Sequence, residues 1–157
     1  MRWNTCLDPR PWRGGGFSLV EVVVVITMLG IISAFAIPRF THLENDIRAS
    51  EIVALSISLR SAAESAHAQY LKSGATLAAA RLGGKPVRLK NGYPDASSAG
   101  IQRAVADLSD FTSSLTATSV TYSKRGAPAA ARCRVTYNAA PASSTPATIT
   151  GLDTSGC

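Results

Sequence analysis

The chain has 157 residues, with 16 Lys and Arg against 10 Asp and Glu, which gives a formal net charge of +6. This length provides the core of one small domain and excludes a two-domain protein. The basic side chains gather at residues 85–90 and 124–134 without aromatic residues interleaved among them. Such charges are typical of a solvated surface, so we do not expect nucleic-acid binding.

Residues 1–16 form a short polar segment that ends in three glycines. Arg2, Arg10 and Arg13 outnumber Asp8 in this segment. This composition is typical of a cytoplasmic leader and not of a folded element. We therefore predict that residues 1–16 are a leader peptide.

An almost unbroken apolar run follows, from Phe17 to Pro38. About 20 apolar residues suffice to cross a bilayer as a helix, so residues 17–38 are predicted to form a transmembrane helix. A cleavable secretory signal is the alternative, because Ala34-Phe35-Ala36 fits the small-residue cleavage pattern. The apolar core of such a signal is about 7–15 residues, which is shorter than this run.

Three residues inside the apolar run need an explanation. A carboxylate is costly within a membrane, so Glu21 should have a partner or a role. Gly30 weakens the helix by about 1 kcal/mol relative to alanine, and Pro38 removes a backbone hydrogen bond at a cost of about 3 kcal/mol. Membrane helices tolerate both residues. The pair also suits a helix that bends or partly melts when it packs into a fibre.

The N-terminal region resembles the type IV prepilin family in the spacing of Gly16, Phe17, Glu21, Gly30 and Pro38. In that family a prepilin peptidase cuts after a glycine, the new N-terminal Phe is methylated, and a glutamate lies four residues further on. The resemblance implies cleavage between Gly16 and Phe17 and N-methylation of Phe17. It also implies that Glu21, Gly30 and Pro38 serve assembly.

Cleavage would create an α-amino group on Phe17, four residues before Glu21. Residues four apart share one face of a helix, so Glu21 can neutralise this amine within one subunit. The family instead implies that Glu21 neutralises the Phe17 amine of a neighbouring subunit during filament assembly. Either pairing avoids an uncompensated charge in apolar surroundings, and the sequence leaves both open.

Residues 39–74 are predicted to continue the helix, to about Lys72, as the amphipathic helix of a head domain. Residues 39–50 are mostly polar, and beyond them apolar residues recur at steps of three and four, as on one buried face. This predicted stripe consists of Ile52, Leu55, Leu59, Ala62, Ala66 and Tyr70.

Residues 75–157 change to a period of two and are predicted to form the loop and antiparallel sheet of the head. Alternation over residues 85–90 predicts a strand, and the sequence after it, residues 91–95, is typical of a turn. Apolar residues at helical spacing predict a short helix over residues 100–111. Three runs rich in Thr, Val or Ala predict strands: residues 115–122, 131–138 and 147–152.

The chain has three cysteines. Removal of a leader that contains Cys6 leaves Cys133 and Cys157. Disulfides form in the periplasm, so we predict that these two are linked and fix the end of the chain. Metal binding is the alternative for two thiols, but His42 and His67 lie far upstream and no Cys-x-x-Cys motif occurs.

The predicted fold class is α+β. One long N-terminal helix packs its second half on a small antiparallel sheet, and the disulfide closes the C-terminal loop. This is the pilin fold that the resemblance implies. Within the family, the Val-x-x-x-x-Gly-Tyr-Pro run at residues 87–94, the short helix after it and Cys157 are most similar to pilins of the mannose-sensitive haemagglutinin (MSHA) type. Cell adhesion is a family expectation for that type.

The sequence predicts neither an enzyme nor a cofactor or metal site. His42 and His67 are expected at the surface, because no nucleophile or acid is arranged with either of them. Three scattered carboxylates fall short of a calcium site: Asp107, Asp110 and Asp153. Four tyrosines are expected to pack in the core or the sheet: Tyr70, Tyr93, Tyr122 and Tyr137.

The resemblance implies a structural subunit of a type IV pilus. Such a subunit is an inner-membrane precursor in a Gram-negative bacterium, with its head in the periplasm. Prepilin peptidase processes it, and it self-assembles into a helical extracellular filament at an inner-membrane assembly platform. A pseudopilin or minor pilin of a type II secretion machine is the alternative, which the disulfide-closed C-terminus disfavours. An unrelated anchored periplasmic protein is disfavoured by the cleavage pair together with Glu21.

Overall fold

The computed structural model describes Gly16 and residues 18–157, without the side chains of residues 36–42. Of the predicted leader, residues 1–16, all but Gly16 lie outside the described residues, and so does Phe17. The chain divides into two compact units, Met1–Phe40 and Thr41–Cys157.

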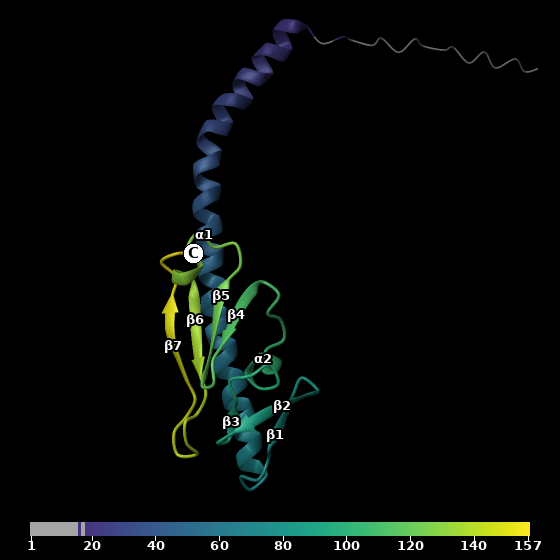
Figure 1. Cartoon of the computed structure of the whole chain (residues 1–157). Helices are drawn as coiled ribbons and strands as arrows, with labels where there is room; N and C mark the ends of the chain where they lie inside the picture. Colours follow the sequence, from purple (N-terminus) through teal and green to yellow (C-terminus); the bar gives the residue numbers. More distant parts are fainter. Residues whose placement is uncertain (1–15, 17) are drawn as a thin grey trace, which may run out of the picture. The chain divides into compact units, whose positions relative to one another are not determined.

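Helix α1 spans Leu19–Lys72 and contributes to both units (Figure 1). Its first part is rich in valine, which by propensity favours a strand. A lone strand would leave its backbone N–H and C=O groups unpaired, whereas a helix pairs them within the segment. Glu21 lies in the first turn of α1, where a carboxylate interacts favourably with the helix dipole.

The predicted transmembrane segment, residues 17–38, is not found: among the described residues, no helix is both long enough and apolar enough to cross a bilayer. Phe17 and the side chains of residues 36–38, which belong to that prediction, lie outside the described residues.

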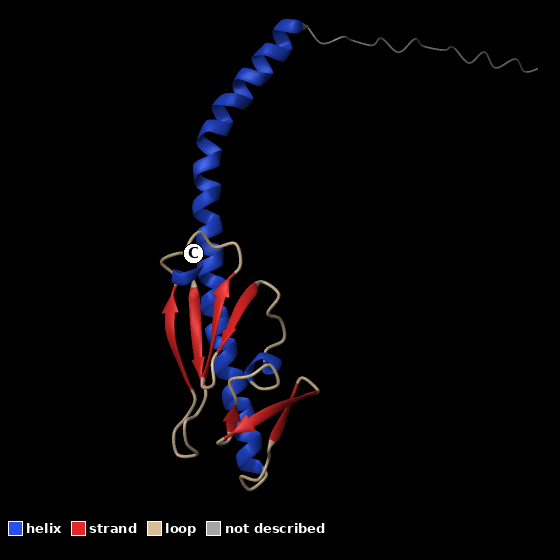
Figure 2. Ribbon diagram, viewed as in Figure 1, coloured by secondary structure: helices blue, strands red, loops and turns tan. Residues whose placement is uncertain are grey.

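The second unit contains a four-stranded antiparallel sheet with the strand order β4-β5-β6-β7, and α1 packs on one face of it (Figure 2). The strands are β4 (Phe111–Leu115), β5 (Ser119–Lys124), β6 (Arg134–Asn138) and β7 (Thr148–Asp153). A short 3₁₀-helix, Ala130–Arg132, precedes β6. The α+β prediction with an antiparallel sheet is confirmed.

The core of this unit lies between the apolar face of α1 and the inner face of the four-stranded sheet. Five positions of α1 are buried: Ile52, Leu55, Leu59, Ala63 and Ala66. From the sheet, alternate residues such as Val120, Tyr122, Val135 and Tyr137 pack against them and are fully buried. Each large apolar side chain buried here contributes about 1.5–3 kcal/mol. The predicted stripe is correct at four of its six positions, whereas Ala62 and Tyr70 are half-buried and Ala63 is buried instead.

A separate three-stranded antiparallel sheet consists of β1 (Ala79–Leu82), β2 (Lys85–Lys90) and β3 (Tyr93–Pro94). Gly83 and Gly84, with φ of +54° and +78°, form the two-residue turn between β1 and β2. Such a turn requires positive φ at both positions, which glycine adopts without strain. The strand predicted over residues 85–90 is confirmed. The sequence did not predict β1, because Ala79–Leu82 lacks alternation.

The helix predicted over residues 100–111 is wrong beyond its first turn. Helix α2 spans only Ile101–Ala104, and Val105 is already extended, with φ of −96° and ψ of 139°. Asp107 then accepts a hydrogen bond from the backbone N–H of Ser109 at 2.9 Å. Such a local bond offers the backbone an alternative to the helix, and Phe111 begins strand β4 instead.

The strand predicted over residues 115–122 is also wrong, because it contains a turn. Strand β4 ends at Leu115 and β5 begins at Ser119. Between them, the Thr116 hydroxyl accepts the backbone N–H of Ser119 at 2.9 Å, as threonine does in tight turns. The strands predicted over residues 131–138 and 147–152 correspond to β6 and β7, with boundaries shifted by a few residues.

Candidate functional site

Three polar side chains lie in the apolar first part of α1. The Thr27 hydroxyl donates to the Val24 carbonyl at 2.8 Å, and the Ser33 hydroxyl donates to the Leu29 carbonyl at 2.7 Å. Both hydroxyls are therefore satisfied within the helix. In the part of the chain that the structure describes, no cation pairs with Glu21. Glu21 is the charged group in this stretch whose partner has to be found elsewhere.

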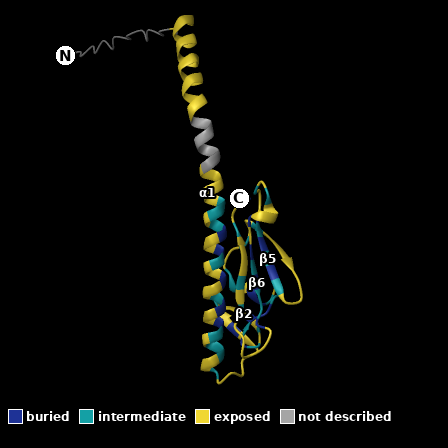
Figure 3. Ribbon diagram, turned by 90° about the vertical axis from the view of Figure 1, so that its left-hand side faces the viewer, coloured by how far each residue is buried: buried dark blue, intermediate teal, exposed yellow. Residues whose placement is uncertain are grey.

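The apolar side chains around Glu21 are exposed (Figure 3). The exposed fraction reaches 80% for Leu19 and 76% for Phe35. A Cβ added at Gly30 would meet nothing within 4 Å, so packing within the described chain gives no steric reason for this glycine. A contiguous exposed apolar surface marks an interaction site. This stretch therefore requires a cover from lipid or from another protein.

Several predicted site residues lie outside the described residues. Gly16 is exposed, but Phe17 and the side chain of Pro38 are not described. Cleavage after Gly16, methylation of Phe17 and the pairing of Phe17 with Glu21 accordingly stay predictions.

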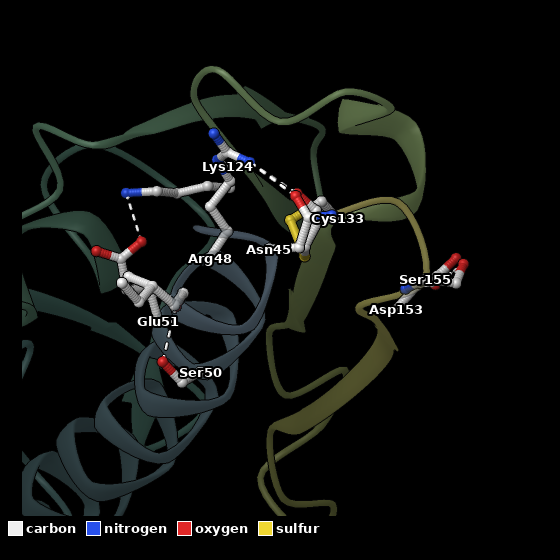
Figure 4. Close-up of a disulfide and its surroundings, with 10 residues drawn as sticks. Asn45, Arg48, Ser50, Glu51, Lys124, Cys133, Asp153 and Ser155 are labelled. Carbon is white, nitrogen blue, oxygen red and sulfur yellow. Dashed lines mark hydrogen bonds and ion pairs between the residues drawn. A yellow bond between two sulfur atoms is a disulfide. The ribbon is translucent and has the colours of Figure 1, made fainter. Parts of the chain in front are cut away.

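Cys133 and Cys157 form a disulfide across a sequence separation of 24 residues, the pair that the sequence predicted (Figure 4). Both are buried. The backbone of Gly156 donates to the Arg132 carbonyl at 2.8 Å and accepts from the Ala129 N–H at 3.0 Å. A Cβ on Gly156 would lie 2.5 Å from the Ala129 oxygen. Glycine is thus required for this segment to lie beside Ala129.

Arg48 of α1 joins the helix to the C-terminal segment. One guanidinium nitrogen lies 3.0 Å from the Glu44 carboxylate, one turn earlier in the helix. The other donates to the Cys157 carbonyl at 3.3 Å. The disulfide loop is therefore held on α1 by a charge-assisted hydrogen bond.

Sequence reasoning missed the ion pair between Lys124 and Glu51, which joins β5 to α1. The Lys124 ammonium is buried, lies 2.7 Å from a Glu51 carboxylate oxygen and 3.6 Å from Asp110, and sits 5.2 Å from the centre of the Phe111 ring. The Lys124–Glu51 contact is drawn in Figure 4. A signal was present, because Lys124 alternates with Val120 and Tyr122 on the buried face of β5. A buried ammonium requires a carboxylate partner.

The surface position predicted for His67 is wrong. This side chain is half-buried and stacks on Tyr93 with ring centres 4.1 Å apart. Its Nδ1 lies 3.0 Å from the Gly92 carbonyl. His67 therefore supports the turn between β2 and β3. The side chain of His42 lies outside the described residues.

Two of the four tyrosines are fully buried, as predicted for core residues. The Tyr137 hydroxyl donates to the Pro94 carbonyl at 2.7 Å and so ties β6 to β3. The Tyr122 hydroxyl finds no hydrogen-bond partner among the described residues. Burial raises the pKa of both phenols well above the ordinary value, so both stay neutral.

The structure assigns separate local roles to the three scattered carboxylates. Asp110 faces Lys124. Hydrogen bonds from Ser109 lower the pKa of Asp107, and hydrogen bonds from Ser155 lower the pKa of Asp153. Within the described part of the chain, no three His, Cys, Asp or Glu side chains come together as metal ligands would.

Among curated proteins, the chain is similar to the type IV narrow pilus major component PilA5 of Thermus thermophilus, with 38% identity over 50 residues. The match covers 32% of this chain and 43% of that relative, less than half of the relative's length. No protein-family model matches the chain, and no solved structure does. The similarity supports the resemblance to type IV pilins, but not the finer resemblance to the MSHA type.

Proposed function

We propose that this protein is a structural subunit of a type IV pilus. The observation that carries the proposal is the exposed apolar first part of α1, which holds Glu21 in its first turn without a cation partner among the described residues. Burial of this surface against other copies would release about 1.5–3 kcal/mol for each large side chain that it covers completely. The similarity to a major component of a narrow type IV pilus supports the same function.

In this proposal the chain is made as an inner-membrane precursor with its head in the periplasm. Prepilin peptidase cleaves between Gly16 and Phe17, and the new amino group of Phe17 is methylated. Subunits then assemble at an inner-membrane platform into an extracellular helical filament. The Glu21 carboxylate of one subunit neutralises the Phe17 ammonium of a neighbour, which avoids an unpaired charge in the apolar interior of the fibre.

Gly30 and Pro38 fit the same assembly. A glycine on a helix surface lets a second helix approach closely, and the described residues leave the space at Gly30 empty. Proline removes one backbone hydrogen bond and weakens the helix around residue 38. The helix can therefore adjust where it is packed against its neighbours. Attachment to surfaces is the finer proposal for the finished fibre.

Mass spectrometry of fibres sheared from the native host tests this function. We expect this chain to be an abundant component of the fibres and to begin at Phe17 with a methylated amine. The membrane fraction of the same cells is the control, since it should also contain uncleaved precursor. An N-terminus at Met1 in the fibres, or one just after Ala36, would contradict the processing. Absence of the chain from surface fibres would favour the pseudopilin alternative.

A further inference from the structure

A polar cavity of about 670 Å³ lies in the second unit, where β2 approaches one end of the four-stranded sheet. Four segments line it: β2, the segment after β3, the turn between β4 and β5, and the segment after β6. Its size falls in the range of about 300–1,000 Å³ that is typical of ligand-binding sites. Charged and hydroxyl side chains gather in its lining: Arg88, Lys90, Asp95, Ser97, Thr116 and Thr118.

A buried carboxylate holds the guanidinium of Arg88 at this cavity. The Arg88 Nε donates to one oxygen of Asp95, a residue that is only 9% exposed. The other Asp95 oxygen accepts the Ser97 hydroxyl. Gly100 leaves room for this carboxylate, because a Cβ at that position would overlap with it. The orientation of the guanidinium is therefore fixed by a side chain that is itself fixed.

The two terminal nitrogens of Arg88 have no hydrogen-bond partner among the described residues, and the side chain is 61% exposed although it is paired with Asp95. Lys90 lies two residues further along β2, so it projects from the same face of the strand. It is exposed, and no carboxylate in the described part of the chain pairs with it. The terminal nitrogens of a guanidinium match the two oxygens of a carboxylate. The strand thus presents a cationic fork next to an ammonium.

The other lining groups indicate which anion fits. Arg88 and Lys90 carry two positive charges and Asp95 one negative charge, so the lining has a net charge of +1 that a single carboxylate neutralises. The Thr118 hydroxyl has no partner among the described residues, and a hydroxyl can both donate to and accept from the hydroxyls of a sugar. The described lining contains no aromatic side chain on which a nucleic-acid base could stack. The cavity therefore fits an acidic sugar better than a nucleic acid.

Hydrogen bonds between the lining segments form the cavity in advance of any ligand. The Asn91 side chain, between β2 and β3, donates to the Ala140 carbonyl at 2.9 Å. The Ala139 N–H donates to the Thr118 carbonyl at 2.9 Å. A site that is already ordered loses little conformational entropy when it binds.

We propose that this cavity binds an acidic sugar, the uronic or sialic acid unit of an anionic surface polysaccharide. The sugar carboxylate lies on the terminal nitrogens of Arg88 and beside the ammonium of Lys90, and a sugar hydroxyl bonds to Thr118. The biological role rests on the proposed pilus function, because the site gives the fibre a ligand for attachment. The binding itself is a property of the second unit.

Isothermal titration calorimetry of the purified full chain in detergent tests the site. The probes are a galacturonic acid trimer and sialyllactose, which represent the two sources of the carboxylate. Their neutral controls are maltotriose and lactose. We expect at least one acidic probe to bind about tenfold more tightly than its neutral control, as for hydrogen bonds to a charged group. Binding of neither acidic probe, or equal binding of the neutral sugars, would overturn the proposal.

Two variants locate the binding. Arg88→Lys keeps a cation beside Asp95 but loses the fork, and should weaken binding of the acidic sugar about tenfold. Lys90→Gln should weaken it about twofold to fivefold, as for an exposed ion pair. The matched control is Lys85→Gln, because Lys85 is exposed on the same strand but does not line the cavity. This control should bind as the wild type does.

Lys90→Gln carries the test by itself where Arg88→Lys disturbs the fold, since Lys90 is exposed and has no partner among the described residues. An affinity that Lys90→Gln leaves unchanged, or that Lys85→Gln lowers equally, would show that the sugar does not bind in this cavity. A short single-stranded DNA oligonucleotide that binds more tightly than the acidic sugars, with the same dependence on Lys90, would make this a phosphate site instead and overturn the sugar assignment.

The outcomes separate this ligand from the proposed function. Fibres that contain the wild-type chain, together with no binding of the acidic sugars, would overturn only the sugar site. Sugar binding by a chain that is absent from surface fibres would contradict the pilus function and leave the site in place.

Discussion

Lys124 is held in the head by two different interactions. Its ammonium is buried next to the Glu51 carboxylate, and it lies over the ring of Phe111. An unpaired buried charge is costly, so the side chain fits the inner face of β5 because Glu51 of α1, at 2.7 Å, and Asp110, at 3.6 Å, supply carboxylates. The pair therefore specifies how β5 lies on α1.

Lys124→Ala should lower the free energy of unfolding by about 1–3 kcal/mol, since it removes the ion pair and the contact of the Lys stem with Phe111. Lys124→Met keeps most of the stem and should cost less, because the Glu51 side chain is 37% exposed and can be hydrated. Denaturant unfolding of the purified full chain in detergent measures both. If Lys124→Ala costs the same in a Glu51→Gln background, the two side chains are not coupled.

This pair also shows the limit of sequence reasoning at single residues. Gly16, Phe17, Glu21, Gly30 and Pro38 are recognised by spacing, because they lie close together along the chain. Lys124 and Glu51 meet only after a strand has been placed on a helix, so no local pattern reports their contact. The alternation of Lys124 with buried residues signals that a partner is needed, but not which carboxylate provides it.

Periodicity predicted the elements that have one buried face. The stripe of α1 and the strands β2 and β6 belong to this class, whereas β7 was predicted although none of its residues is fully buried. Periodicity failed where hydrogen bonds from short polar side chains determine the backbone conformation. This is the case in the turn between β4 and β5 and in the segment after α2. Strand β1 was missed because its stability comes from pairing with β2 and from the Gln69 side chain, and not from a pattern of its own.

The disulfide links two elements of the sheet, because it joins the segment before β6 to the segment after β7. Replacing both Cys133 and Cys157 with alanine should lower the free energy of unfolding by about 3 kcal/mol, the value expected for a loop of this length. Wild-type protein unfolded under reducing conditions is the control and should show a similar loss. Labelling of two free thiols in the native, unreduced protein would contradict the bond itself. We also expect less fibre from this variant, because an untied chain end frays.

The described residues of the whole molecule have two kinds of surface. The unit Thr41–Cys157 buries its own core, whereas the apolar side chains of α1 before residue 36 are exposed. An apolar surface of this kind is stable in water only when something covers it. The fold of the head could be predicted in outline from the sequence. The groove that α1, Leu82 and residues 104–111 line could not, and neither could the polar cavity at β2, because the segments that line each of them lie far apart in the chain.

Glu21→Ala separates anchoring from assembly, since an anchor alone does not need the carboxylate. An acidic residue costs about 2.5–3.5 kcal/mol at the centre of a membrane helix, so its removal should not impair insertion. We expect normal membrane insertion and cleavage after Gly16, together with a loss of most filaments. Assembly should fail because the Phe17 ammonium then lacks its counter-charge inside the fibre. Sheared fibre yield and the mass of the membrane-bound subunit measure the two parts.

Two neighbouring polar residues provide the controls for this last variant. Thr27→Ala and Ser33→Ala remove hydroxyls whose hydrogen bonds among the described residues are to their own helix, so both should assemble normally. Glu21→Gln keeps the size of the side chain and loses its charge, and should fail as Glu21→Ala does if charge is what matters. Normal filaments from both Glu21 variants would contradict the pairing with Phe17. A block in cleavage would instead show that Glu21 is needed by the peptidase, because the defect would then precede assembly.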